Sequence, residues 1–106
     1  MDSAEYVRLV LDAYRATPGA GGVVRKPDRV LAAQLFTRGV PVTVVEQALV
    51  LAAARRLARP VDAPPLGVIR SLAYFSPVID EVLASPVSED YYRYLRHRLP
   101  RLTGRP

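Results

Sequence analysis

The stretch from residue 43 to residue 58 constrains this chain more than any other feature, because it is apolar almost all the way round a helix. A surface helix carries one apolar stripe, whereas a helix that is apolar on every side has to be enclosed by other elements. Thr43 and Glu46 have the spacing of a capping box and place the start of this helix. The sequence therefore predicts a buried central helix with other helices packed around it.

The remaining apolar side chains also recur at helical spacing, and no strand pattern or internal repeat stands out. A first amphipathic helix is expected over residues 3–16, with Ser3 as its N-cap. A flexible glycine-rich loop over residues 19–22 follows it. A second helix should begin near Pro27, which suits the first helical position, and end before Gly39.

Two further helices are expected after the central one, and prolines punctuate both. A fourth helix should run over residues 66–83. Pro77 either kinks it or restarts it, with Ser76 as the N-cap of the restarted part. The last helix should run over residues 88–99 and stop at Pro100.

The length of 106 residues suits one domain. We expect an all-α bundle of about five helices over residues 1–100, followed by a basic flexible tail over residues 101–106. The N-terminus is acidic, unlike a signal peptide, and the longest apolar stretch, residues 48–54, is too short to span a bilayer. These features predict a cytoplasmic protein with no membrane partner.

The groups that catalysis needs are scarce in this chain. It has no Cys and 1 His, which excludes disulfides, thiol nucleophiles, zinc–thiolate sites and sites with several His ligands from one chain. His97 lies between two arginines and is expected at the solvated surface. The 19–22 loop resembles a phosphate-binding loop only in composition, because no Lys-Ser/Thr follows it. We therefore expect no enzyme activity, no cofactor and no bound metal.

The second and third predicted helices, joined by a turn at Gly39, have the order of a helix-turn-helix motif. The start of the would-be reading helix offers only Thr43, Glu46 and Gln47. A helix that reads bases needs side chains near its N-terminus that can make two hydrogen bonds to a base edge, such as Arg. We interpret the pair as ordinary packed helices rather than as a reader of duplex DNA.

The C-terminal stretch over residues 91–106 interleaves Arg with Tyr and contains no acid. The chain as a whole holds 15 Lys and Arg against 10 Asp and Glu, a net charge of +5, which favours a polyanionic partner. Arg binds phosphate and aromatic rings stack on bases, so this stretch predicts a nucleic-acid contact surface. In the alternative interpretation, Tyr91, Leu95 and Leu99 dock the helix and the arginines only form its wet face.

The predicted nucleic-acid contacts are Arg93, Arg96, Arg98 and Arg101, with Tyr92 and Tyr94 as stacking residues. Arg55, Arg56, Arg59 and Arg70 extend this surface if neighbouring helices place them beside it.

A resemblance covers about half of the chain, from the second helix through the turn at residues 39–41, the capped Ala-rich helix and the Pro-rich loop to residues 71–75. This order resembles the C-terminal domain of DnaD-like bacterial replication-initiation proteins. The Tyr-x-x-x-Ile-x-x-x-Trp motif of that family would fall on Tyr74, Val78 and Val82, with Val in place of Ile and of Trp. The resemblance implies DNA or a replicative ATPase as the partner, and Tyr74 as a contact. The alternative for Tyr74 is a core aromatic residue.

We expect a non-catalytic nucleic-acid-binding accessory module, serving DNA replication initiation or mobile-element maintenance. The sequence leaves open whether it binds single-stranded or duplex DNA. The alternative is a helical protein–protein interaction adaptor, either a homo-oligomer or the partner of a larger ATPase or transposase. We consider this alternative because 50% of the residues are hydrophobic, which is more than a chain this small can bury internally.

Overall fold

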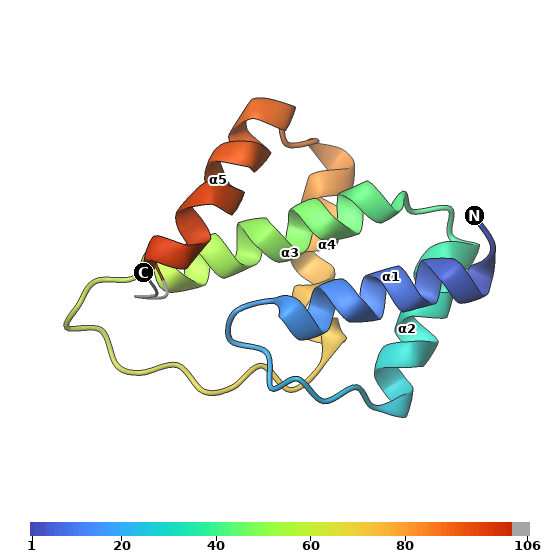
Figure 1. The fold of residues 1–106 in the computed structure, drawn as a ribbon, viewed down its shortest axis with the longest axis horizontal. Coiled ribbons are helices and arrows are strands. Elements are labelled where there is room, and N and C mark those ends of the chain that lie inside the picture. Colours follow the sequence, from blue (N-terminus) through green and yellow to red (C-terminus); the bar gives the residue numbers. More distant parts are fainter. Residues whose placement is uncertain (103–106) are drawn as a thin grey trace.

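The computed structural model describes residues 1–102, and their side chains up to Leu99; it is an all-α bundle, as predicted (Figure 1). The elements are α1 (Ser3–Ala16), α2 (Lys26–Thr37), α3 (Val42–Leu57), a short 3-10 helix η1 (Leu72–Phe75), α4 (Ser76–Ala84) and α5 (Glu89–Leu102). Most of the predicted tail, residues 103–106, and the side chain of Arg101 lie outside the described residues.

Helix α3 is the centre of the bundle, which confirms the prediction from its all-round apolar pattern. It contacts α1, η1, α4 and α5, and in Figure 1 it runs through the middle, with α5 above it and α1 below. The side chains that it buries are Val45, Ala48, Leu49, Leu51, Ala52, Ala53 and Ala54. Small alanines on several sides let the neighbouring helices approach α3 closely.

Helices α1 and α2 pack on each other at one end of α3. The hydroxyl of buried Tyr6 donates a hydrogen bond to the Val40 carbonyl at 2.8 Å, which ties α1 to the turn between α2 and α3. The bounds of α1 are those predicted, but the N-cap is Asp2, whose carboxylate accepts the Glu5 N–H at 2.8 Å. Ser3 is instead the first helical residue, so the predicted cap was wrong by one position.

A buried carboxylate joins the start of α2 to η1. Asp28 is 2% exposed, and its Oδ2 accepts the Arg25 N–H at 2.8 Å. Its Oδ1 accepts the Leu72 N–H, from the far end of the sequence, at 2.9 Å. A buried charged group is tolerated where hydrogen-bond donors satisfy it. The sequence carried no signal for this link, because Leu72 contributes only its backbone.

The capping box predicted at Thr43 and Glu46 is not formed. Helix α3 begins at Val42, its N-cap is Pro41, and no side chain caps it. The Pro41 carbonyl accepts the Val44 N–H at 3.0 Å, so the N-cap lies two residues before the predicted Thr43. Proline fixes its own φ and can lead directly into a helix without a side-chain cap.

The predicted helix from Leu66 is wrong up to Ser71. This segment is extended, and Ile69 pairs with Ala20 in an isolated parallel bridge. The Ile69 N–H donates to the Gly19 carbonyl at 2.8 Å, so the segment makes its hydrogen bonds across the chain rather than within a helix. The glycine loop predicted to be a flexible linker is therefore paired over residues 19–21.

The split at Pro77 is confirmed in part. The 3-10 helix η1 ends at Phe75, and α4 starts at Ser76, with Phe75 rather than Ser76 as its N-cap. At the other end of the chain, Ser88 accepts the Tyr91 N–H through its hydroxyl at 3.2 Å, as expected for the cap of α5. The backbone of α5 continues to Leu102 rather than stopping before Pro100, so the predicted end of this helix was wrong.

Candidate nucleic-acid interface

Helix α5 stands on one side of the bundle and packs on α3 among the described elements (Figure 1). Leu95 is buried, and Leu99 is half-buried against the core cluster. Tyr91, the third residue of the predicted docking stripe, is 49% exposed, so that alternative holds only for the two leucines. Because one stripe of α5 is enough to hold it, the rest of its surface faces solvent or the two grooves beside it.

The solvent-exposed surface of α5 is basic. Arg93, Arg96, His97 and Arg98 are all exposed, which confirms the surface position expected for His97. Among the described residues, the one ion pair made by this group joins Arg93 to Glu89 at 3.9 Å, and both of those side chains are highly exposed. Exposed pairs of this kind are worth about 0–1 kcal/mol, so Arg93 stays available to a stronger anion.

One flank of α5 carries a row of two tyrosines and an arginine. The rings of Tyr91 and Tyr94 stack at 6.2 Å between centroids and 26° between planes. Arg98 donates to the Tyr94 hydroxyl at 2.6 Å, and its guanidinium lies 5.5 Å over the same ring. The two rings are 49% and 51% exposed. The row borders a groove of about 690 Å³ between α5 and the C-terminal ends of α3 and α4.

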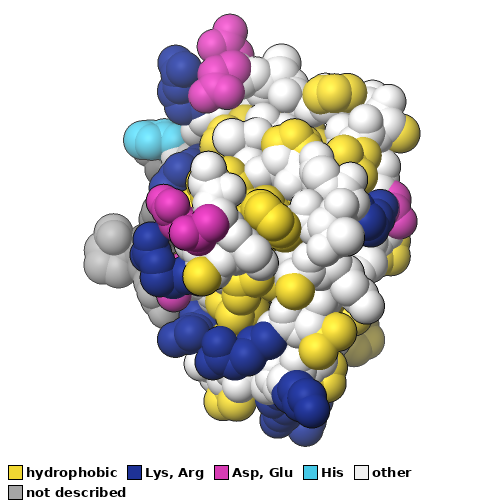
Figure 2. Space-filling model, turned by 90° about the vertical axis from the view of Figure 1, so that its right-hand side faces the viewer, with side chains coloured by type: hydrophobic (Ala, Val, Ile, Leu, Met, Phe, Trp, Pro, Cys, Tyr) yellow, Lys and Arg dark blue, Asp and Glu magenta, His cyan; other side chains and the backbone are white. Residues whose placement is uncertain are grey.

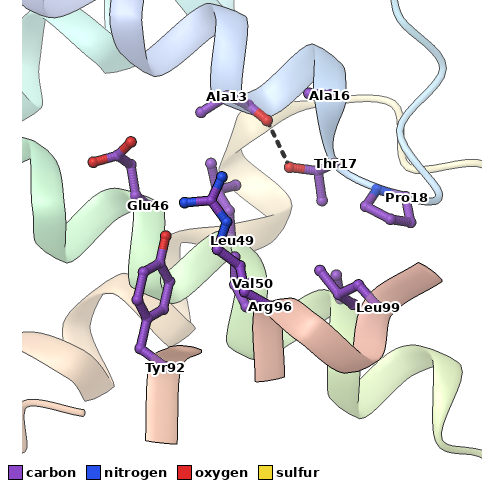
Figure 3. A pocket seen from close by; sticks show the side chains of 11 residues that line it. Ala13, Ala16, Thr17, Pro18, Glu46, Leu49, Val50, Tyr92, Arg96 and Leu99 are labelled. Carbon is purple, nitrogen blue, oxygen red and sulfur yellow. Dashed lines mark hydrogen bonds between the residues drawn. The ribbon is translucent and has the colours of Figure 1, made fainter. Parts of the chain in front are cut away.

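The other flank of α5 carries Tyr92 and Arg96, one helical turn apart. The Arg96 guanidinium lies 6.0 Å over the ring of Tyr92, which is half-buried. Both side chains project into a second groove, of about 320 Å³, between α1, α3 and α5 (Figure 3). The carboxylate of Glu46, from the first turns of α3, lines the same groove.

The arginines at the end of α3 have hydrogen-bond partners within the chain. Arg55 is held by Glu81 of α4 through two hydrogen bonds, at 3.1 and 2.6 Å. This hydrogen bonding raises the pKa of Arg55 and lowers the pKa of Glu81. Arg55 borders the 690 Å³ groove, but its guanidinium already binds the Glu81 carboxylate.

Arg56 and Arg59 hold the long loop over residues 58–71. Arg56 donates to the Gly67 carbonyl, and its guanidinium lies 5.9 Å over the Tyr74 ring. Arg59 donates to the Pro64 carbonyl at 2.7 Å. Each of these two guanidinium groups therefore uses part of its donors on a backbone oxygen within the chain.

Arg70 and Tyr74 lie on the 58–71 loop and on η1, and neither residue lines the two grooves beside α5. Arg70 is exposed, and its carbonyl accepts a hydrogen bond from Arg25 at 3.3 Å. Tyr74 is half-exposed, so the alternative interpretation as a core residue is wrong; the core aromatic residue is its neighbour Phe75. Val82, the last position of the family motif, is fully buried and could not serve as a contact.

The helix-turn-helix geometry is not available to a DNA duplex. Helix α3 is covered by α1, η1, α4 and α5, while α2 packs on α1 and η1. Thr43 is exposed, but Glu46 and Gln47 are half-buried, and Val45 is fully buried. A helix enclosed on these sides cannot enter a major groove. The two helices pack mainly on other elements of the bundle rather than on each other as a pair.

A second group of cations was not singled out from the sequence. Arg8 and Arg15 of α1 and Arg29 of α2 border a hollow of about 590 Å³ between the two helices. Asp12 lies 3.7 Å from Arg8 in the same hollow. On the side of the molecule drawn in Figure 2, Lys and Arg side chains gather toward the lower left edge. The three arginines come from two helices, so only the packing of α1 on α2 brings them together.

A scan against protein-family models and searches of curated proteins and of solved structures found no match to this chain. Within the described residues, no helix is both long enough and apolar enough to cross a membrane.

Proposed function

We propose that this chain is a non-catalytic nucleic-acid-binding accessory module that contacts DNA through α5 in the cytoplasm. The observation that carries the proposal is the exposure of Arg93, Arg96 and Arg98 on one helix, where the only ion pair that they make among the described residues is the exposed pair of Arg93 with Glu89. A setting in replication initiation or mobile-element maintenance rests on the resemblance around Tyr74 and is part of the same proposal.

The physical argument is electrostatic. Each guanidinium that contacts a phosphate releases condensed counterions, so affinity for nucleic acid falls as salt rises. Arg93, Arg96 and Arg98 lie on α5 within two helical turns, and each is exposed. Partly exposed tyrosines beside such cations are the second component of surfaces that hold single strands.

The test is a fluorescence anisotropy titration of a labelled single strand and its duplex, at about 50 and 200 mM salt. The variant is the triple change Arg93→Ala, Arg96→Ala and Arg98→Ala. Three lost phosphate contacts should reduce the slope of log K against log salt by about 2 for a single strand and nearly 3 for a duplex.

The matched control removes the same charge from the hollow between α1 and α2, through Arg8→Ala, Arg15→Ala and Arg29→Ala. It should alter the slope much less, because those arginines border a hollow that only residues of α1 and α2 line. Equal losses in the two triple variants would mean that only net charge matters, and the proposed surface would be wrong.

A second candidate function, a protein-interaction adaptor, is favoured by apolar side chains on the 58–71 loop. Val61, Leu66 and Val68 are all exposed there, and exposed apolar side chains that form one patch mark interaction sites. Changing all three to Ser should abolish any self-association seen by sedimentation velocity. Val30→Ser, at an exposed site on α2, is the control. A wild-type monomer at high concentration would exclude the homo-oligomer.

A further inference from the structure

The groove between α1, α3 and α5 is lined mostly by apolar side chains, and Tyr92 and Arg96 of α5 project into it (Figure 3). Leu49 and Val50 of α3 form its floor, the small side chains Ala13 and Ala16 line the α1 side, and the Tyr92 ring lines the α5 side. Its volume of about 320 Å³ is at the small end of the range for ligand sites. A flat ring could lie between an aromatic wall and a wall of alanines.

The polar side chains of the groove limit what that flat group can be. Arg96 reaches the groove from the basic side of α5, so a ligand bound there can also place a phosphate on this arginine. The Thr17 hydroxyl is already used, since it donates to the Ala13 carbonyl at 2.8 Å (Figure 3). Stacking on an aromatic ring next to a cation is how single-stranded nucleic acids are held.

Glu46 is the feature that a general phosphate-binding surface does not explain. Its half-buried carboxylate makes no ion pair and no side-chain hydrogen bond with the residues that the structure describes. A carboxylate would repel the phosphates that Arg96 attracts. It is well suited, however, to accept two parallel N–H bonds from one ligand.

The bases differ in what they offer such an acceptor. Guanine has two adjacent donors on its pairing edge, N1–H and the N2 amine, which match the two oxygens of a carboxylate. Adenine and cytosine present one amine beside an acceptor nitrogen, and thymine presents one N–H between two carbonyls, so a carboxylate meets a lone pair at each of them. In a duplex this edge of guanine is occupied by cytosine.

We propose that this groove holds an unpaired guanine, with its ring against Tyr92, its pairing edge on Glu46 and a neighbouring phosphate on Arg96. The inference rests on the proposed nucleic-acid function and deepens it, because it assigns the strand type and a base preference. Only a single strand can present the edge that Glu46 reads.

The experiment compares labelled oligothymidylates of about 12 nucleotides, a length within the usual site size of such proteins. One strand is all thymine, and three others carry a single central guanine, hypoxanthine or adenine. A good bidentate contact should make the guanine strand bind about 5- to 150-fold more tightly than the thymine strand. Hypoxanthine lacks the N2 amine and should fall between them.

The variant Glu46→Gln keeps the size of the side chain and removes its second acceptor oxygen. It should abolish the guanine preference while the thymine strand binds at least as tightly as before, since one negative charge is lost. The control Glu5→Gln makes the same charge change at an exposed site of α1 outside the groove and should keep the preference.

The outcomes separate the two proposals. Salt-sensitive binding of all four strands with equal affinity would overturn the guanine site and leave the nucleic-acid function standing. A guanine preference that survives Glu46→Gln would also overturn it, because another group would then be reading the base. Failure of every strand to bind at low salt would remove the function itself, and the guanine site with it.

Discussion

The arginines at the end of α3 and the arginines of α5 look alike in the sequence but differ in the fold. Arg55, Arg56 and Arg59 meet a carboxylate or backbone carbonyls, and they hold α4 and the 58–71 loop in place. On α5, Arg93 and Arg96 meet no such acceptor within 3.5 Å among the described residues. The difference teaches that a basic cluster becomes a candidate binding surface only where the fold leaves its donors unsatisfied.

The largest expected effect is the loss of stability when a core residue of η1 is changed, compared with a surface residue of α5. Phe75 is fully buried and meets the rings of Tyr14 and Tyr74 edge-on, at 6.1 and 5.1 Å between centroids. Phe75→Ala should lower the free energy of unfolding in urea by about 3–5 kcal/mol, because it leaves a cavity in the core. Tyr94→Ala on α5 removes a half-exposed ring and should cost far less. Similar losses would mean that α5 is as integral to the core as η1.

The next effect concerns the link that anchors the end of the loop. Asp28→Ala leaves the buried Leu72 N–H without its acceptor and should cost about 1–3 kcal/mol of stability. Urea unfolding followed by circular dichroism measures it, and Asp12→Ala at an exposed site of α1 is the control. A loss no larger than that of the control would show that water replaces the Asp28 carboxylate.

A smaller and more specific effect contrasts one arginine from each region. Arg56→Ala should lower the free energy of unfolding by about 0.5–1.5 kcal/mol, because it removes the bond to Gly67 and the contact with Tyr74. Arg96→Ala should leave stability nearly unchanged and weaken DNA binding more than Arg56→Ala does. The reverse pattern, measured by urea unfolding and anisotropy, would break the comparison between the two regions.

The smallest effect is a pH dependence in the Arg55–Glu81 pair. The hydrogen bond from Arg55 lowers the pKa of Glu81 in the folded chain, so the unfolded chain binds this proton more readily. The stabilisation is therefore present above the unfolded pKa of Glu and is lost as pH falls through the lower, folded pKa. The difference in urea midpoint between the wild type and Glu81→Gln should shrink toward acid pH. A difference that stays constant with pH would show that the pair does not contribute through charge.

Near neighbours in the sequence account for most of what could be predicted. Helical spacing located α1, α2, α3 and the α5 start, and the all-round apolar pattern placed α3 at the centre. The errors concern caps and the segment before η1. Asp2 and Ser3 are both good caps, and spacing alone did not choose between them. The segment from Leu66 to Ser71 was predicted to be helical, but Ile69 within it donates its N–H to the Gly19 carbonyl.

Part of the candidate site could likewise be predicted from the sequence, and part could not. The exposure of Arg93, Arg96 and Arg98 followed from the position of the leucines on α5, so the sequence could predict it. The groove that holds Glu46 beside Tyr92 could not be predicted, because residues far apart in the chain line it.

The sequence by itself determined the helices, the buried centre and the basic character of α5, since each depends on residues within a few turns of one another. The tertiary structure alone decided which arginines have hydrogen-bond partners within the chain, where the loop segments pair and which side chains share a groove. Those outcomes depend on backbone carbonyls and amides, which every residue carries and which no side-chain pattern marks.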